Sequence, residues 1–233
     1  GLLLAACVYG KWDSAVATLS AAALILMLVG IVDDVRGLSV RLRLFTYSIV
    51  CLWVAFALSR DTASGTGLWK VLLVCSVAFA MLWTLNLYNF MDGIDGIAAI
   101  QAILACCGAA WVSWVYGQHG SYVLVCLLLA AAHAGFLVWN WPPARLFMGD
   151  AGSVPTGFLV AALALWGAVQ GWINPLCWLV FMAVFITDSS FTLLRRVRAR
   201  QAFTQPHREH AYQRLSRRWT HLRVDMLLAV INK

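Results

Sequence analysis

Apolar stretches of nearly membrane-spanning length alternate with short polar clusters along the chain. A helix needs roughly 20 apolar residues to cross the hydrocarbon core of a bilayer. Seven stretches come near that length: residues 14–32, 44–59, 68–87, 97–116, 122–139, 154–170 and 175–194. Shorter apolar stretches at residues 2–8 and 222–232 have the pattern of one helix that ends and another that begins. The pattern predicts an all-α, polytopic integral membrane protein with about seven full transmembrane helices and partial ones at each end.

Composition excludes a soluble globular domain. Of 233 residues, 62% are hydrophobic and 12% are charged, and the mean hydropathy is +0.80. Soluble domains are about 45–50% apolar. The chain begins with Gly1 and stops inside an apolar run. We therefore expect residues 1–233 to be a single transmembrane catalytic domain that is truncated at both ends.

The basic residues are distributed unevenly between the two ends of the predicted spans. Lys and Arg accumulate in the cytoplasmic loops of membrane proteins. Thirteen of the seventeen basic residues fall on one face, and Lys11, Arg60 and Lys70 fall on the other. We therefore predict a multi-pass protein of the bacterial inner (cytoplasmic) membrane whose basic loop, about residues 195–221, faces the cytoplasm. We expect no nucleic-acid partner.

Five polar clusters interrupt the spans on this same face. They are GIVDDVRG (residues 30–37), NLYNFMDGIDG (86–96), RLFMGDAGS (145–153), FITDSS (185–190) and PHREHAYQRL (206–215). Ionisable groups at membrane depth are costly and usually functional. Five such clusters on one face indicate an active site at the membrane surface.

Two of the clusters contain closely spaced carboxylates. Asp33 and Asp34 repel each other unless a cation lies between them or one is protonated. They indicate either a metal or proton-acceptor site, or a helix end that headgroup water and the nearby Arg36 stabilise. Asn89, Asp92 and Asp95 recur at every third residue, so a helix would place them on one side. The alternative for this second cluster is a plain Asp-Gly turn.

Single carboxylates mark two further clusters. Asp150 lies between two glycines, which leave room for a phosphate or a metal, although a short tight loop would need the same residues. Phe147 beside it could stack on a base or anchor at the membrane interface. Asp188 falls inside the seventh predicted span, seven residues before Arg195 on the same helix face, and we expect it to have a structural role in which it pairs with Arg195 through Thr192 or water.

The last cluster combines imidazoles with guanidinium groups. His207 and His210 are surrounded by Arg208, Arg214 and further arginines, a combination that suits an anionic ligand because arginine binds phosphate oxygens in pairs. Zinc is the rival ligand, but no third His or Cys lies nearby to complete a tetrahedral set. His221 is isolated in the sequence, and we predict no function for it.

The candidate ligands are rich in oxygen, which favours Mg²⁺ or Mn²⁺ over softer metals. A hard metal, basic surroundings and a cytoplasmic membrane face suggest phosphoryl chemistry that joins a soluble, nucleotide-bearing substrate to a lipid. The rival function is a cation- or proton-coupled membrane transporter, in which buried acids would lie near the bilayer midplane.

Four motifs occur in the order of a known family: DD after a span, NLYNFMDGIDG, NWPPARLFMGDAGS and HREHAYQRL. From about residue 30 to residue 215, the chain resembles the polyprenyl-phosphate N-acetylhexosamine-1-phosphate transferases of membrane glycosyltransferase family 4, and most of all the bacterial O-antigen-initiating branch. The resemblance implies transfer of a sugar 1-phosphate from a UDP-N-acetylhexosamine to undecaprenyl (polyprenyl) phosphate, with release of UMP and a need for Mg²⁺. It is compatible with a homodimer.

The resemblance also implies roles for individual residues. The catalytic candidates are Asp33, Asp34, Asp92 and Asp95, and one of the adjacent pair is expected to be the nucleophile or the base that deprotonates the lipid phosphate. Asp150 matches the magnesium ligand. The substrate-binding candidates are Asn89, Phe147 at the uracil-stacking position, and the diphosphate-binding residues His207, Arg208, His210 and Arg214.

Overall fold

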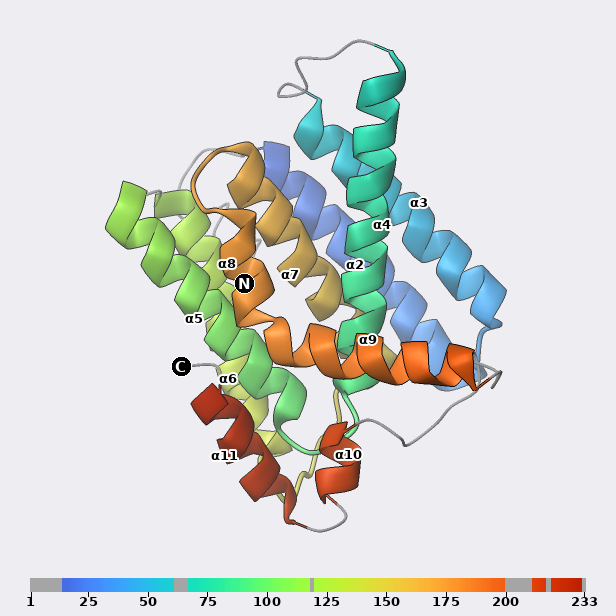
Figure 1. Ribbon diagram of the computed structural model, residues 1–233, viewed down its shortest axis with the longest axis vertical. Coiled ribbons are helices and arrows are strands. Elements are labelled where there is room, and N and C mark those ends of the chain that lie inside the picture. The colour runs from blue at the N-terminus through green and yellow to red at the C-terminus, as the bar shows by residue number, and fades with distance from the viewer. Residues whose placement is uncertain (1–13, 61–66, 118–119, 200–210, 217–218, 232–233) are drawn as a thin grey trace.

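A computed structural model of the protein describes residues 14–60, 67–117, 120–199, 211–216 and 219–231 (Figure 1). Within these ranges the chain forms helices and no strand. The helices are α2 (Ser14–Arg36), α3 (Val40–Ser59), α4 (Leu68–Met91), α5 (Ile97–Gly117), α6 (Gly120–Asn140), α7 (Gly149–Val169), α8 (Pro175–Phe181), α9 (Ala183–Arg198), α10 (Ala211–Ser216) and α11 (His221–Ile231).

The helices α2 to α7 confirm the first six predicted spans, because all six are long and apolar enough to cross a membrane. The seventh predicted span differs from a straight helix: it is broken into α8 and α9, which meet at an angle of 72°. A break inside a membrane protein frees backbone groups that need new partners. Gln101 of α5 supplies one, because its side-chain amide donates to the carbonyl of Phe181 at 2.6 Å.

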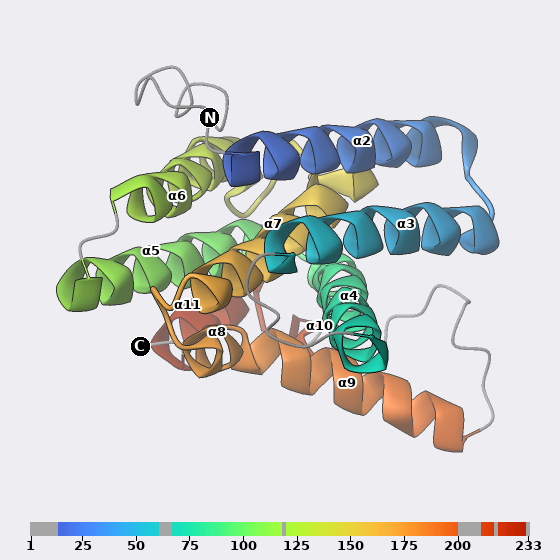
Figure 2. The same ribbon diagram turned by 90° about the horizontal axis from the view of Figure 1, so that it is seen from above.

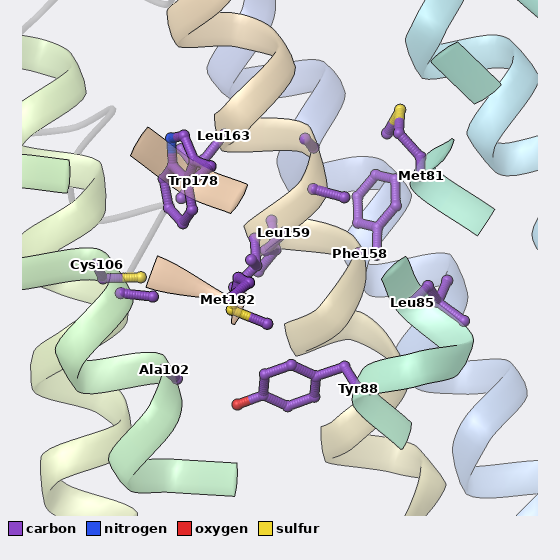
Figure 3. Packing of buried hydrophobic residues seen from close by; sticks show 14 of the residues in the cluster. Met81, Leu85, Tyr88, Ala102, Cys106, Phe158, Leu159, Leu163, Trp178 and Met182 are labelled. Atoms are coloured by element: carbon purple, nitrogen blue, oxygen red, sulfur yellow. The ribbon is translucent and has the colours of Figure 1, made fainter. Parts of the chain in front are cut away.

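The bundle is organised around α7, which lies in the middle when the molecule is seen from above (Figure 2) and packs against α2 and α4. Phe158 and Leu163 of α7 and Leu85 of α4 are fully buried in the resulting core (Figure 3). The helices α5 and α6 form a closely packed pair beside it. Large apolar side chains such as Phe45 and Val71 remain more than half exposed on the outside, where a bilayer rather than water would surround them.

A glycine allows α2 to pack closely against the start of α7. A β-carbon on Gly30 would lie 2.5 Å from the carbonyl oxygen of Asp150 and 2.7 Å from the α-carbon of Ala151. Only a residue without a side chain permits this approach. It brings the acidic end of α2, with Asp33 and Asp34, directly beside the first turn of α7.

The helices α9, α10 and α11 follow α8 in the sequence. In Figure 1, α9 crosses α4, and α10 and α11 lie in the lower part of the view, below most of the membrane-length helices. Asp188 of α9 holds the start of α10, because its carboxylate accepts the backbone N–H groups of Ala211 at 2.8 Å and Tyr212 at 3.2 Å. Thr192 donates to the same carboxylate at 3.4 Å, so the expected structural role of Asp188 agrees with its contacts.

Candidate active site

Three helix ends bring the predicted site residues together. Asp33 and Asp34 lie in the last turn of α2, Asn89 lies in the last turn of α4, and Asp150 lies in the first turn of α7. Alternate loops of a bundle lie at the same end, which explains why clusters separated by more than 100 residues can meet. The structure therefore places the first three sequence clusters in one site.

Arg43 provides the cation between the acidic helix ends. Its Nη1 lies 2.6 Å from Oδ2 of Asp33 and 2.9 Å from Oδ2 of Asp150. The exposed fractions of the side chains are 8% for Asp33 and 22% for Asp150, so bulk water screens this contact only in part. The sequence analysis suggested a cation near the Asp33–Asp34 pair, but the guanidinium group that fills this role belongs to Arg43 in the first turn of α3 rather than to Arg36.

Asp34 has a different partner from Asp33. Its two carboxylate oxygens accept the backbone N–H groups of Asp150 and Ala151, each at 3.0 Å. The first N–H groups of a helix lack intrahelical acceptors, and the helix dipole favours a negative charge beside them. Gly149 has a positive φ of 60°, and a β-carbon there would lie 2.7 Å from Asp34. Asp34 therefore caps α7 and fixes the position of Asp150.

Asn89 holds the second carboxylate oxygen of Asp150. Its amide nitrogen donates to Oδ1 of Asp150 at 2.9 Å and to the hydroxyl of Ser153 at 2.8 Å. The Ser153 hydroxyl in turn donates to the carbonyl of Gly149 at 2.9 Å. The Asp150 carboxylate is thus oriented from two sides, by Arg43 and by Asn89. Ser153 was not singled out in the sequence, although it ends the RLFMGDAGS cluster.

Of the two interpretations of Asn89, Asp92 and Asp95, the structure shows the Asp-Gly turn and not one continuous helix face. The helix α4 ends at Met91, and Asp92 to Gly96 form a turn in which Gly96 has a φ of 81°. The turn nevertheless directs Asp92 and Asp95 to the same pocket as Asn89. Burial, together with the negative charges of Asp150 and Asp34, raises the pKa of Asp92 to about 7.

The pocket that these residues share has a volume of about 450 Å³, a size that suits a small-molecule ligand. One side of its lining carries Asn89, Asp92 and Asp150, and Phe147 also lines it with a side chain that is 72% exposed. An exposed aromatic ring at a pocket offers a flat surface to a planar ligand. Phe147 thus offers such a surface at this pocket.

A histidine that the sequence analysis did not assign also lines the pocket. Nδ1 of His221, at the start of α11, lies 3.2 Å from Oδ2 of Asp95. The same oxygen accepts the backbone N–H of Ala144 at 3.1 Å. In the sequence His221 stands 126 residues from Asp95, and the carboxylate nearest to it, Asp225 four residues later, does not indicate this contact.

Part of the predicted histidine motif cannot be placed. His207, Arg208 and His210 lie outside the described residues, and Arg214 falls on α10. The start of α10 is held by Asp188 and lies near the Asp92 turn, because the Tyr212 hydroxyl donates to the carbonyl of Phe90 at 3.0 Å. The segment that follows the motif is therefore anchored next to the pocket.

The residues fit a hard metal whose ligands come partly from the protein and partly from the substrate. Among the described residues, no three His, Cys, Asp or Glu side chains come together as a complete metal site. Mg²⁺ does not need such a cage, because it usually binds to one or two carboxylates together with water and substrate phosphates. Asp150, with Asp92 on the same pocket, supplies oxygen ligands of this kind.

Comparison with known proteins identifies the family. The sequence profile of glycosyl transferase family 4 matches residues 16–168, which is more than half of the chain and covers α2 to α7 except for the first two residues of α2 and the last residue of α7. The protein belongs to glycosyl transferase family 4, as the motif order predicted.

Individual relatives refine this comparison. The chain is 27% identical over 214 residues to a probable undecaprenyl-phosphate N-acetylglucosaminyl 1-phosphate transferase of Bacillus subtilis, with 87% of the chain and 59% of that protein covered. It is 30% identical over 207 residues to an undecaprenyl-phosphate alpha-N-acetylglucosaminyl 1-phosphate transferase of Yersinia pestis, with 83% and 56% covered. A phospho-N-acetylmuramoyl-pentapeptide-transferase of Prochlorococcus marinus is 28% identical over 203 residues, with 77% and 52% covered. The chain thus spans about half the length of these relatives.

Proposed function

We propose that the protein transfers an N-acetylhexosamine 1-phosphate from a UDP-sugar to undecaprenyl (polyprenyl) phosphate and releases UMP. The reaction takes place at the cytoplasmic face of the bacterial inner membrane and initiates a cell-envelope polysaccharide of the O-antigen type. The observation that carries the proposal is the convergence of Asp33, Asn89 and Asp150 at one end of a membrane-length bundle, beside a pocket lined by Asp92 and Phe147. Membership of glycosyl transferase family 4 and the names of the relatives support it.

The acidic end of the pocket is assigned to the diphosphate. Asp150 would hold Mg²⁺, or Mn²⁺, together with phosphate oxygens of the substrate. When bound, the metal neutralises the charge that develops on the leaving phosphate. Arg43 and Asn89 orient the Asp150 carboxylate before the substrate arrives, which lowers the cost of assembling the site.

The carboxylates divide into orienting and proton-accepting groups. Asp34 caps α7 and Asp33 holds Arg43, so both determine where Asp150 lies. Asp92 lines the pocket together with Asp150 and is assigned as a group that can accept a proton from the lipid phosphate. Asp33 and Asp34 stay candidates for the nucleophile or base that the family resemblance implies.

The nucleotide is assigned to the aromatic ring that lines the pocket. Phe147 is assigned to stacking against uracil, and Asp95 forms part of the same lining. His207, Arg208, His210 and Arg214 are assigned to the diphosphate because imidazole and guanidinium groups bind phosphate oxygens. Arg214 lies on α10, which Asp188 holds near the pocket, and the other three residues precede this helix in the sequence.

A cation- or proton-coupled transporter is less favoured by the same geometry. A transporter of this kind binds its ion near the bilayer midplane, between broken helices. The acids of the site lie instead at the ends of α2 and α4 and in the first turn of α7. The one broken helix pair among the described residues, α8 with α9, contributes no residue to the pocket lining.

A transfer assay with labelled donors tests the proposal. Membranes that contain the full-length protein are supplied with undecaprenyl phosphate, Mg²⁺ and each of several UDP-sugars that are labelled in the sugar. We expect label from one UDP-N-acetylhexosamine to enter the lipid fraction, and we expect the Asp150→Asn variant to transfer little. Equal transfer by the variant, or no transfer from any UDP-sugar, would overturn the proposal.

A further inference from the structure

We propose that His221 is a positioning residue for Asp95, and that α11 forms one wall of the substrate pocket through this contact. The proposal rests on the proposed function, because the pocket is taken to hold the UDP-sugar. It adds a residue and a helix that lie beyond residues 16–168, the part of the chain that matches the family profile.

The contact geometry shows how His221 would act. Its Nδ1 lies 3.2 Å from Oδ2 of Asp95 and 3.4 Å from the backbone nitrogen of the same residue. A protonated Nδ1 donates to the carboxylate, whereas an unprotonated one accepts the backbone N–H. With Ala144 donating to the same Oδ2 at 3.1 Å, the carboxylate is held between two chain segments that are far apart in the sequence. Loss of His221 would leave Asp95 with a single donor on this oxygen.

The packing of α11 explains why His221 reaches the pocket. The helix begins at His221, and its buried residues Val224, Asp225 and Leu228 follow at the spacing of one helix face. This face packs against α5, whose first residue, Ile97, comes directly after the Asp92 to Gly96 turn. His221 is thus the end of a docked helix face and not an isolated loop side chain.

Asp225 indicates independently that the position of α11 serves more than stability. Its side chain is almost fully buried, and neither carboxylate oxygen has a hydrogen-bond partner among the described residues. A β-carbon on Gly96 would lie 2.8 Å from its Oδ2, so the acid presses against the turn that carries Asp95. Burying a polar group without a partner destabilises a fold. Such a cost is typical of residues that are placed for function.

The composition of the pocket lining points to the consequence for the substrate. Asp92, Asp95 and Asp150 line the pocket, and His221 is the one basic side chain among its described lining residues. A UDP-sugar is itself an anion, so a loose and uncompensated Asp95 would weaken its binding. The contact between His221 and Asp95 shares no residue with the Asp33–Arg43–Asp150 ion pairs. We therefore expect His221 to affect KM more than kcat.

Kinetics of the full-length protein in membranes test the proposal. His221→Ala should raise the KM for the UDP-sugar about tenfold, the effect of losing one hydrogen bond to a charged group, and should change kcat less than threefold. His221→Asn, whose amide nitrogen can take the place of Nδ1, should restore most of the affinity. Met226→Ala, on the exposed side of α11, is the matched control and should behave like the wild type.

A double-mutant cycle separates positioning from a general structural effect. Once Asp95→Ala has removed the carboxylate, His221→Ala should raise KM no further. Additive increases in KM, or equal KM values for His221→Asn and His221→Ala, would overturn the proposal.

A measurement without substrate keeps the proposal testable if the proposed function fails. Hydrogen exchange of the backbone amides at residues 92–97 should be faster in His221→Ala than in the wild type, and unchanged in Met226→Ala. Unchanged exchange in His221→Ala would refute the positioning role even in an active enzyme. Faster exchange in a protein without transferase activity would refute the proposed function alone.

Discussion

A single methyl group at the contact between α2 and α7 should disable the site without removing any polar atom. In Gly30→Ala the new β-carbon would lie 2.5 Å from the carbonyl oxygen of Asp150, whereas ordinary contacts begin near 3.4 Å. The nearest atoms are backbone atoms of α7 and cannot rotate away. The two helices therefore have to separate by about 0.9 Å at this point.

The displacement acts directly on the catalytic geometry. Asp33 and Asp34 follow Gly30 by one turn of α2, and their contacts to α7 span this interface. Asp34 accepts the N–H groups of Asp150 and Ala151 at 3.0 Å. Arg43 links Asp33 to Asp150, with Nη1 at 2.6 Å from the first carboxylate and 2.9 Å from the second. A misplacement of about 1 Å in an active site costs on the order of 10²-fold in rate, or about 2.7 kcal/mol of transition-state stabilisation. We expect the turnover of Gly30→Ala to fall by about that factor.

Gly135→Ala is the matched control, because a β-carbon on Gly135 meets no atom within 4 Å. Both substitutions exchange glycine for alanine within a membrane-length helix, so both gain about 1 kcal/mol of helix propensity. Initial rates of lipid-linked product formation are compared at saturating substrate and equal protein levels. If Gly30→Ala retains activity within threefold of Gly135→Ala, the inferred coupling between helix packing and catalysis is wrong.

Four further predictions address the metal, the pH dependence, the histidine motif and the topology. Asp150→Asn should lower turnover by orders of magnitude and weaken its dependence on Mg²⁺; near-normal activity at low Mg²⁺ would exclude Asp150 as the ligand. A carboxyl whose pKa rises on folding from 3.8 to about 7 favours the folded state at low pH, and this contribution is lost as the pH rises from about 4 through 7. Asp92→Asn should therefore raise the melting temperature of the metal-free protein more at pH 8 than at pH 5. The corresponding gain in the free energy of unfolding at pH 8 should be at most about 4 kcal/mol. An equal shift at both pH values would contradict this. Replacing His207 and His210 with alanine should raise KM for the UDP-sugar and lower kcat, and stoichiometric zinc in the wild type that is lost in this variant would refute phosphate binding. A cysteine placed at position 205 should resist an impermeant reagent added to intact cells, and labelling there would overturn the cytoplasmic orientation.

The spans and the grouping of the acidic clusters could be predicted from the sequence because both depend on local composition. Runs of apolar residues determine where a chain crosses a bilayer. Alternate loops then lie on the same face, which placed Asp33, Asn89 and Asp150 at one end before any contact was known. The structure adds that the three lie within one network of hydrogen bonds.

The partners of those acids could not be predicted, because they depend on how helices pack. Arg43 looked like one of many loop cations, and only the approach of α3 to α7 places it between Asp33 and Asp150. The three-residue spacing left open whether Asn89, Asp92 and Asp95 share a helix face or follow an Asp-Gly turn, and the structure ends α4 at Met91. The break between α8 and α9 could not be predicted either, because Gln101, which donates to the carbonyl of Phe181 at the break, lies 80 residues earlier.

His221 shows the same limit most clearly. A lone histidine at the start of an apolar segment carries no recognisable pattern, and its contact with Asp95 exists only because α11 docks against α5. For Asp188, the sequence predicted that the residue matters but not which groups it contacts. Its position inside an apolar helix indicated importance, but its acceptance of two N–H groups from α10 depends on how α9 and α10 pack.

The nucleotide product of the reaction tests the central claim most directly. Full-length protein in membranes is incubated with undecaprenyl phosphate and a UDP-N-acetylhexosamine labelled in the uridine ring, and the released nucleotide is separated and counted against lipid-linked sugar. Transfer of a sugar 1-phosphate breaks the bond between the two phosphates, so we predict one UMP for each lipid-linked sugar formed and none without the lipid. Release of UDP in the same ratio would show that the sugar is transferred without its phosphate and would contradict the account.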